Sequence, residues 1–259
     1  MEEIKMVELN KSLFEYCLRL GDSSLIAGQR LAEWCGHGPI LEEDIAMTNM
    51  SLDLIGQSRT FLTYAGEIEG KGRTEDDLAY LRDTMEFRNV LLVEQPNGDF
   101  AVTMMKQFFF SAYLFLLYKE LSKSKDTTIA AIAAKSLKEV TYHLRHTSQW
   151  ILRLGDGTEE SNQRTQNAVN DLWMYTGDLF DMDAVDAELI KAGIACDLNK
   201  IKQEWQAMIT EILTKAKLTI PAPDVWMMKG SRTGKHTEYL GYILAEMQTL
   251  QREYPGAKW

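Results

Sequence analysis

Long stretches of this chain contain no helix breaker, and this feature most restricts the folds that it can adopt. Only five prolines occur in 259 residues, and between the breaks apolar residues recur at spacings of three and four. This spacing is the period of an amphipathic helix, whereas a half-buried strand would alternate strictly. The sequence therefore predicts an all-α protein with long helices packed as a bundle.

Four long helices are expected in the first 155 residues, and shorter ones after them. The first is expected to start at a cap on Ser12 and to stop at Gly36, with a kink at Gly21. Acidic residues at 42–44 suit the positive end of a second helix. The long helices are expected over residues 12–36, 40–67, 100–121 and 127–154, and the shorter ones over 78–88, 161–180, 184–192, 199–217 and 236–252.

The expected helix over residues 100–121 is apolar almost all round. Several of its faces must be buried, so this helix is either central in the fold or covered by a partner chain. Its most apolar run, residues 108–118, is shorter than the ~20 residues that span a bilayer. The start of the chain also lacks the basic and apolar regions of a signal peptide. We therefore expect a soluble, cytoplasmic protein.

Charge and cysteine content argue against several kinds of partner. A formal net charge of −10 opposes binding to nucleic acid or to anionic membranes, because both attract clustered lysine and arginine. Cys17, Cys35 and Cys196 are widely spaced, which indicates neither a disulfide framework nor a zinc site. We expect them to be small buried side chains in a reducing compartment.

The chain lacks a motif that helix bundles use to bind two irons. In such bundles, two helices each supply a Glu-x-x-His pair and two more each supply a Glu. None of the four histidines has a carboxylate three residues before it, because those positions hold Trp34, Val140, His143 and Thr233. The sequence therefore predicts the architecture of an oxygenase without its paired ligands.

The best ligand candidate is a stripe on the expected helix over residues 127–154. Glu139, His143 and His146 stand at i, i+4 and i+7, so they share one face of that helix. Carboxylate together with imidazole suits iron, zinc or manganese. The same pattern is also typical of an ordinary helix surface, and Arg145 beside it fits a solvated or interface face. Metal binding and a structural role both stay open here.

Other polar residues interrupt the apolar stripes and would complete a site if the long helices converge. The residue three after Asp53 is Gly56, which offers no ligand. Lys106, if it points inward, could neutralise a carboxylate at the place of a lost cation. His37 is expected to hydrogen-bond within the stop of the first helix, and His236 either opens the last helix or lies in an interface. The further polar candidates are Asp22, Gln29, Glu33, Asn49, Gln57, Asp99 and Gln107.

Seven strings in the chain carry a resemblance to a known family. They are Leu18-Arg-Leu-Gly-Asp22, Gln29-Arg-Leu-Ala-Glu-Trp-Cys-Gly-His37, Leu52-Asp-Leu-Ile-Gly-Gln57, Leu91-Leu-Val-Glu-Gln-Pro-Asn-Gly-Asp-Phe100, Tyr142-His-Leu-Arg145, His236-Thr-Glu-Tyr-Leu-Gly241 and Glu246-Met-Gln-Thr-Leu-Gln-Arg252. These strings closely resemble the C-subunit family of phenylacetyl-CoA epoxidase, the ring 1,2-phenylacetyl-CoA monooxygenase. The likeness runs from about residue 12 to residue 259 and is looser between about 181 and 232.

The resemblance implies a ferritin-like bundle in a bacterial multicomponent system that epoxidises the ring of phenylacetyl-CoA. In that system a catalytic subunit holds the di-iron centre and binds the CoA thioester, and a reductase passes electrons from NADPH. The family that this chain resembles is the metal-free structural partner of the catalytic subunit. The chain itself is then expected to hold no cofactor, with Glu33, Asp53, Glu139 and His143 as remnants of a metal site. The reductase and small subunits are further implied partners, and the isolated chain can self-associate.

The expected domain organisation is an N-terminal extension, residues 1–11, followed by a single ferritin-like domain, residues 12–259. Its core bundle covers about 12–180, and additional C-terminal helices cover about 181–259. Two alternatives stay open: an active di-metal oxygenase, and a stand-alone protein that binds a CoA thioester. The acidic charge argues against the second, since CoA phosphates favour a basic pocket.

Overall fold

The structure, a computed structural model, describes residues 2–257, with side chains from residue 6 onward. Within this range it contains ten α-helices, three 3-10 helices and no strand. The prediction of an all-α fold is confirmed. The chain divides into two compact units, each built from segments that are far apart in the sequence.

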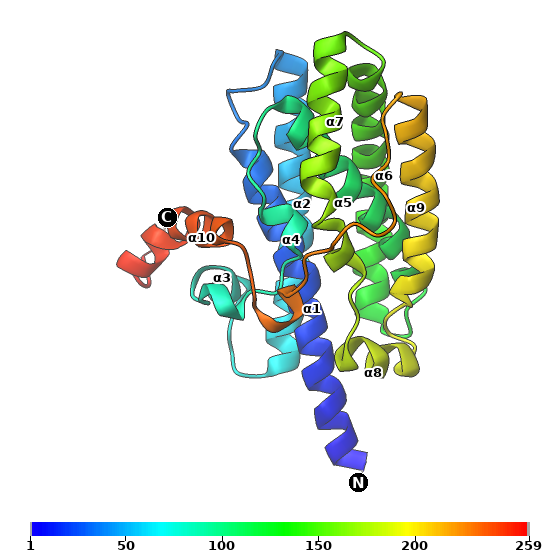
Figure 1. Ribbon diagram of the computed structural model, residues 1–259. Helices are drawn as coiled ribbons and strands as arrows, with labels where there is room; N and C mark the ends of the chain where they lie inside the picture. Colours follow the sequence, from blue (N-terminus) through cyan, green and yellow to red (C-terminus); the bar gives the residue numbers. More distant parts are fainter. Residues whose placement is uncertain (1, 258–259) are drawn as a thin grey trace. The chain divides into compact units, whose positions relative to one another are not determined.

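Unit 1 comprises Met1–Pro96, Asp183–Ala192 and Gly230–Trp259. Its two long helices, α1 (Glu2–Ala32) and α2 (Leu41–Glu69), lie side by side (Figure 1). α8 packs on α1, and α10 packs on α3, α4 and η1. The bounds of these shorter helices are α3 (Glu75–Tyr80), η1 (Thr84–Glu86), α4 (Leu91–Glu94), α8 (Ala184–Ala192), η3 (Ser231–Thr233) and α10 (Glu238–Glu253).

The first helix begins earlier than predicted. Ser12 lies inside α1 and does not cap it; its hydroxyl donates to Glu188 of α8. Residues 2–11 contain no glycine or proline and are mostly good helix formers, so the helix extends past the expected cap. α1 also continues through Gly21, where a Cβ would lie 2.8 Å from the side chain of Leu62 in α2. Gly21 is therefore a close-contact position between two helices, and the expected kink stays a prediction.

The single helix expected over residues 78–88 is also wrong. Two short helices, α3 and η1, occupy this part of unit 1. Thr74 and Asp77 form a capping box at the start of α3, and the Glu86 carboxylate accepts a hydrogen bond from the N–H of Asp83 at 2.8 Å. Each set of local hydrogen bonds stabilises its own short helix, so the two do not merge.

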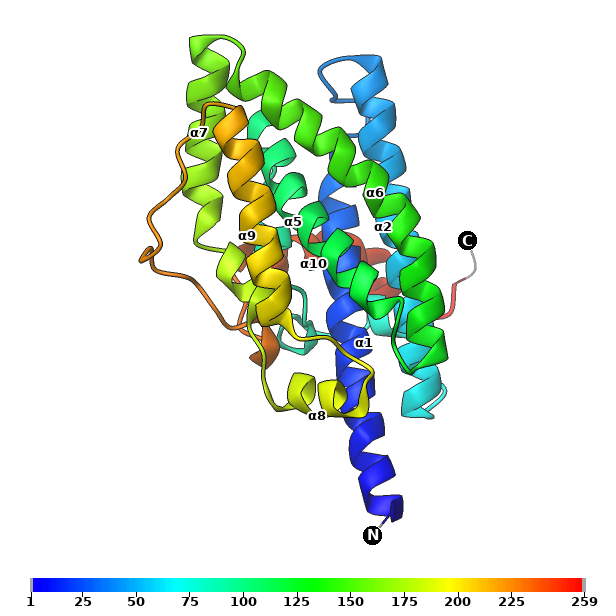
Figure 2. The same cartoon turned by 90° about the vertical axis from the view of Figure 1, so that its right-hand side faces the viewer.

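Unit 2 comprises Asn97–Met182 and Gly193–Lys229. α5 contacts α6, α7 and α9 (Figure 2). The Trp205 indole donates to the carbonyl of Phe109 at 2.9 Å, and the rings of Phe109, Trp173, Phe180 and Trp205 pack with neighbouring centroids 5.4–6.0 Å apart. The helices of this unit are α5 (Phe100–Leu121), α6 (Thr127–Gly155), α7 (Glu159–Trp173), η2 (Thr176–Phe180) and α9 (Leu198–Lys215).

The expectation that the third long helix is central is confirmed within unit 2. α5 covers the predicted residues, and 83% of its most apolar 18-residue window is buried. By length and composition alone α5 could cross a membrane, but the core helices of soluble proteins meet the same criteria. α6 ends one residue later than predicted.

The long helices form two pairs, α1 with α2 and α5 with α6, as expected for a ferritin-like bundle. The residues of the expected N-terminal extension, 1–11, are helical from Glu2 onward and continue into α1. The expected C-terminal helices over 181–259 are shared between the units, since α8 and α10 belong to unit 1 and α9 belongs to unit 2. A single domain over 12–259 stays a prediction; Met1, Lys258 and Trp259 lie outside the described residues.

The three cysteines differ in exposure. Cys17 in α1 is buried as expected, Cys196 is half-buried and Cys35 is exposed. The expectation is wrong for Cys35 because α1 ends at Ala32 and this thiol lies in the turn that follows.

Candidate functional site: buried ion pairs of unit 1

The four expected remnants of a metal site are divided between the two units. Glu33 and Asp53 belong to unit 1, and Glu139 and His143 belong to unit 2. Glu33 is exposed just after α1, and its carboxylate lies 2.7 Å from Nη1 of Arg30. Asp53 and Glu139 are half-buried, whereas His143 is buried. Their convergence on one site stays a prediction.

Two of the other polar candidates have clear structural partners in unit 2. Asp99 caps α5 by accepting a hydrogen bond from the N–H of Val102 at 3.0 Å. Lys106 is fully buried, as its hypothesis requires, and its Nζ donates to the amide oxygen of Asn97 at 3.0 Å. The pairing of Lys106 with a carboxylate stays a prediction. Of the remaining candidates, Asn49 is exposed, Gln29 is half-buried, and Gln57 and Gln107 are buried.

Asp22 is a fully buried carboxylate of α1 whose partners are arginines. The guanidinium of Arg82 donates to both of its oxygens, with Nη1 3.0 Å from Oδ2. The backbone N–H of Arg88 donates to Oδ2 at 2.8 Å. Arg82 is itself buried, with its guanidinium carbon 4.4 Å from the ring centroid of Phe87. A buried carboxylate needs charged or hydrogen-bonding partners, and these donors supply them.

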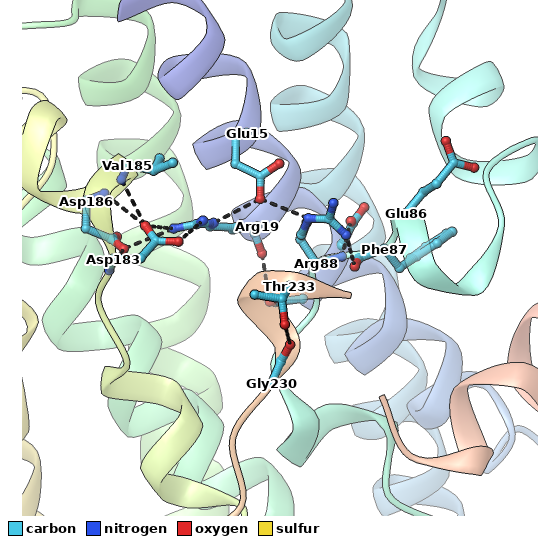
Figure 3. Close-up of polar contacts among 12 residues, drawn as sticks. Glu15, Arg19, Glu86, Phe87, Arg88, Asp183, Val185, Asp186, Gly230 and Thr233 are labelled. Atoms are coloured by element: carbon cyan, nitrogen blue, oxygen red, sulfur yellow. Dashed lines mark hydrogen bonds and ion pairs between the residues drawn. The ribbon is translucent and has the colours of Figure 1, made fainter. Parts of the chain in front are cut away.

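A second group of ion pairs, the α1–α8 ion cluster, consists of Glu15, Arg19, Arg88, Asp183 and Asp186. Arg19 is buried and donates to both oxygens of Asp183, at 3.0 and 2.6 Å, and to Asp186 at 3.0 Å. Oε1 of Glu15 accepts from Nε of Arg19 at 3.2 Å and from Nε of Arg88 at 2.9 Å. Figure 3 shows Arg19 between these carboxylates. The cluster thereby joins three segments that are distant in the sequence.

The two aspartates of this cluster have pKa values that move in opposite directions. Burial raises the pKa of Asp183, but the hydrogen bond and charge of Arg19 outweigh burial and lower that pKa to about 2. Asp186 is more deeply buried, and burial raises its pKa above the ordinary value. Asp183 is therefore the firmly ionised partner of Arg19.

The third group, the Glu94 junction, consists of Arg30, Phe87, Asn89, Glu94, His236 and Thr237. Glu94 is fully buried. Its carboxylate accepts hydrogen bonds from Nδ1 of His236 at 2.9 Å, from the Asn89 amide at 2.9 Å and from the N–H of Thr237 at 2.6 Å. Arg30 donates to the carbonyl of Glu94 through Nε at 3.2 Å and Nη2 at 2.8 Å. Glu94 thus connects α1 and α4 with the start of α10.

The surroundings of His236 in this junction favour its imidazolium form. Its Nδ1 faces Glu94 and its Nε2 lies 2.9 Å from the carbonyl of Phe87, and only a protonated ring donates from both nitrogens. Burial opposes the charge, but the hydrogen bond and the charge of Glu94 outweigh burial and raise the pKa of His236. Of the two roles expected for His236, the structure shows the internal one, next to the start of the last helix.

Three of the strings that carry the family resemblance meet in these groups. Asp22 ends the first string, Glu94 lies in the string over 91–100, and His236 begins the string over 236–241. Sequence reasoning does not identify Arg82 or Glu94 as site members. The available signal is a charged residue inside an apolar run, as in Leu91-Leu-Val-Glu94. In all three groups the charged side chains face hydrogen-bonding partners, so the arrangement is suited to holding helices together. In the Glu94 junction, Oδ1 of Asn89 and Oγ1 of Thr237 are buried without such a partner.

These residues do not fit the dinuclear metal centre that a ferritin-like fold can hold, which needs bridging carboxylates and an imidazole for each metal. The histidines of unit 1 are His37 and His236. His37 is exposed and lies 3.1 Å from the carbonyl of Cys35 within its turn, as predicted, whereas both nitrogens of His236 are engaged. Asp22 is held by arginines. Gly56 has no side chain, and no atom lies within 4 Å of the place of its Cβ.

The side chains that the structure describes give the same picture across both units. Among them, no group of three or more His, Cys, Asp and Glu residues is arranged to hold a metal ion.

Comparison with known proteins assigns these helices to a family. The chain matches the phenylacetic acid catabolic protein family over residues 2–259, and it therefore belongs to that family. It is 48% identical over 247 residues to the C-subunit of 1,2-phenylacetyl-CoA epoxidase from Escherichia coli (strain K12). That alignment covers 95% of this chain and 99% of the E. coli protein. The resemblance inferred from the seven strings is confirmed at the level of the family.

Proposed function

We propose that this chain is a non-catalytic, structural subunit of a bacterial monooxygenase complex that epoxidises the aromatic ring of phenylacetyl-CoA during phenylacetate breakdown. The family membership and the near-complete alignment with one subunit of an epoxidase support this proposal. Its partner in the proposal is the di-iron catalytic subunit of the complex. The proposed location is the cytoplasm.

The main support for the non-catalytic role is that the buried polar side chains of unit 1 already pair with one another. Asp22 is paired with Arg82, and His236 is paired with Glu94. The position where α2 would offer a histidine after Asp53 is Gly56. In the proposal, the iron and the electrons from NADPH belong to partner subunits, and this chain takes no cofactor.

An apolar stripe on α2 supports a lasting contact with the catalytic subunit. Leu41, Ile45 and Leu52 lie at i, i+4 and i+11, and their exposed fractions are 72%, 52% and 62%. Clustered exposed aliphatic side chains are typical of interaction sites, and permanent subunit interfaces are more hydrophobic than transient ones. The proposal places the catalytic subunit on this stripe.

Co-expression with the catalytic subunit followed by size-exclusion chromatography tests the pairing. We expect the wild-type chain to elute in a stable complex and the double variant Ile45→Glu, Leu52→Glu to elute alone. Met85→Glu, on an exposed methionine of η1, is the matched control and should leave the complex intact. A wild-type chain that forms no complex would rule out the proposed function.

Elemental analysis of the chain from iron-supplemented culture tests the absence of a cofactor. We expect iron only in the complex that contains the catalytic subunit. Near-stoichiometric iron in the isolated chain would instead support a di-metal oxygenase. Micromolar binding of a CoA thioester to the isolated chain in calorimetry would support a stand-alone binding protein.

A further inference from the structure

α6 has a buried face and an exposed face with the same spacing. Its buried residues stand at positions 129, 133, 136, 140, 143, 147, 151 and 155. The residues two positions after the first seven of these are all exposed. We call this exposed set the basic face of α6; it consists of Ala131, Lys135, Lys138, Tyr142, Arg145, Gln149 and Arg153.

The basic face carries four positive charges and no carboxylate. Among the residues that the structure describes, none of Lys135, Lys138, Arg145 and Arg153 is in an ion pair. The chain as a whole has 38 acidic and 28 basic residues, so acidic partners are in surplus. Other cations of unit 2 do form ion pairs: Nζ of Lys123, for example, lies 2.7 Å from Oε1 of Glu120. Glu139, which follows Lys138 on α6, is half-buried and lies outside the exposed set. The four exposed cations without an ion pair therefore form a surface open to an external anion.

Aromatic rings orient the two arginines of this face. The guanidinium carbon of Arg145 lies 5.7 Å from the ring centroid of Tyr142, and that of Arg153 lies 5.3 Å from that of Trp150. A cation placed over a ring is partly ordered yet keeps its N–H donors free for a carboxylate. Arginine and tyrosine are also enriched in protein interfaces. The face is thus prepared for contact with another protein.

We propose that the basic face of α6 docks an acidic surface of a second protein that binds transiently. This inference rests on the proposed function, because the partner sought is another component of the enzyme complex. Charged contacts give fast, salt-sensitive association, whereas the apolar stripe on α2 suits a permanent partner. A component that delivers electrons must bind and leave repeatedly, so the reductase is the occupant that fits this face.

The test measures binding of the purified reductase component to the assembled complex on a biosensor, at low and at high salt. We expect wild-type binding to weaken with salt, and Lys135→Glu, Lys138→Glu to weaken low-salt binding at least about ten-fold. Arg145→Glu, Arg153→Glu should do the same. Lys200→Glu, Lys202→Glu is the control, because it makes the same charge change at exposed positions of α9 in the same unit. It should leave the affinity within about two-fold.

Unchanged affinity in both α6 variants would overturn the inference. So would tighter binding of the wild-type chain to phosphatidylserine vesicles or duplex DNA than to the reductase. The isolated chain is measured against the reductase in parallel, so docking is tested even if assembly fails. If the chain does not assemble with the catalytic subunit, the proposed function is wrong. If the complex assembles but the α6 variants bind the reductase as tightly as wild type, only the docking surface is wrong.

Discussion

Asp22 and Arg82 form a buried ion pair whose two members cannot be removed independently. Asp22→Asn leaves the buried guanidinium of Arg82 without a counter-charge, so we expect a loss of about 3–5 kcal/mol in the free energy of unfolding. Glu160→Gln, which breaks the exposed pair with Arg164 in α7, is the control and should cost no more than about 1 kcal/mol. Urea unfolding measures both. Equal costs would show that burial of the first pair does not matter.

His236 makes stability depend on pH. Because its folded pKa is raised, its contribution is fully present below the pKa of an unfolded histidine, about 6.5, and is lost as the pH rises through the folded pKa. The difference in the free energy of unfolding between wild type and His236→Gln should therefore be largest below about pH 6.5 and shrink at alkaline pH. Chemical unfolding at a series of pH values, from below about 6.5 into the alkaline range, measures this difference.

Within the single helix α2, we expect alanine at two glycine positions to change the stability in opposite directions. A Cβ on Gly66 would collide with the backbone carbonyl of Arg73, so Gly66→Ala should destabilise by about 1–3 kcal/mol. Gly56 is inside the helix with open space around its Cβ position, so Gly56→Ala should stabilise by up to about 1 kcal/mol. Thermal unfolding of the isolated chain compares them. Destabilisation by both would mean that Gly56 has a contact partner.

The elements also differ in how far local sequence predicts them. α5 and α8 have their predicted bounds, because local signals act within a few residues: Gly98 and the Asp99 cap come before α5, and Gly193 follows α8. The start of α1 and the region over 78–88 were predicted wrongly. In the first case Ser12 has a tertiary partner, Glu188 in α8, and in the second two short caps override one apolar pattern.

Across the whole molecule, unit 1 is assembled from three segments of the chain, and the last segment contributes α10. Gln248 and Arg252 of α10 donate to the carbonyl of Arg82, at 3.0 and 2.9 Å. Deleting residues 238–259 leaves this carbonyl uncovered, so amide exchange should accelerate in α3, η1 and α4. Hydrogen-exchange mass spectrometry measures this. Deleting only 254–259 keeps α10 and should leave exchange in those helices unchanged.

The sequence by itself determined the helical class, the bounds of α5 and the absence of Glu-x-x-His pairs, because periodicity, caps and ligand spacing are local. It also indicated Asp53, Glu139 and His143 as polar residues on long helices, but not what surrounds them. Only the tertiary structure decided that Asp22 faces Arg82, that Glu94 faces His236, and that Arg19 faces aspartates 164 and 167 positions away. Such pairings depend on how distant segments pack, and no local pattern specifies which buried charge will meet which.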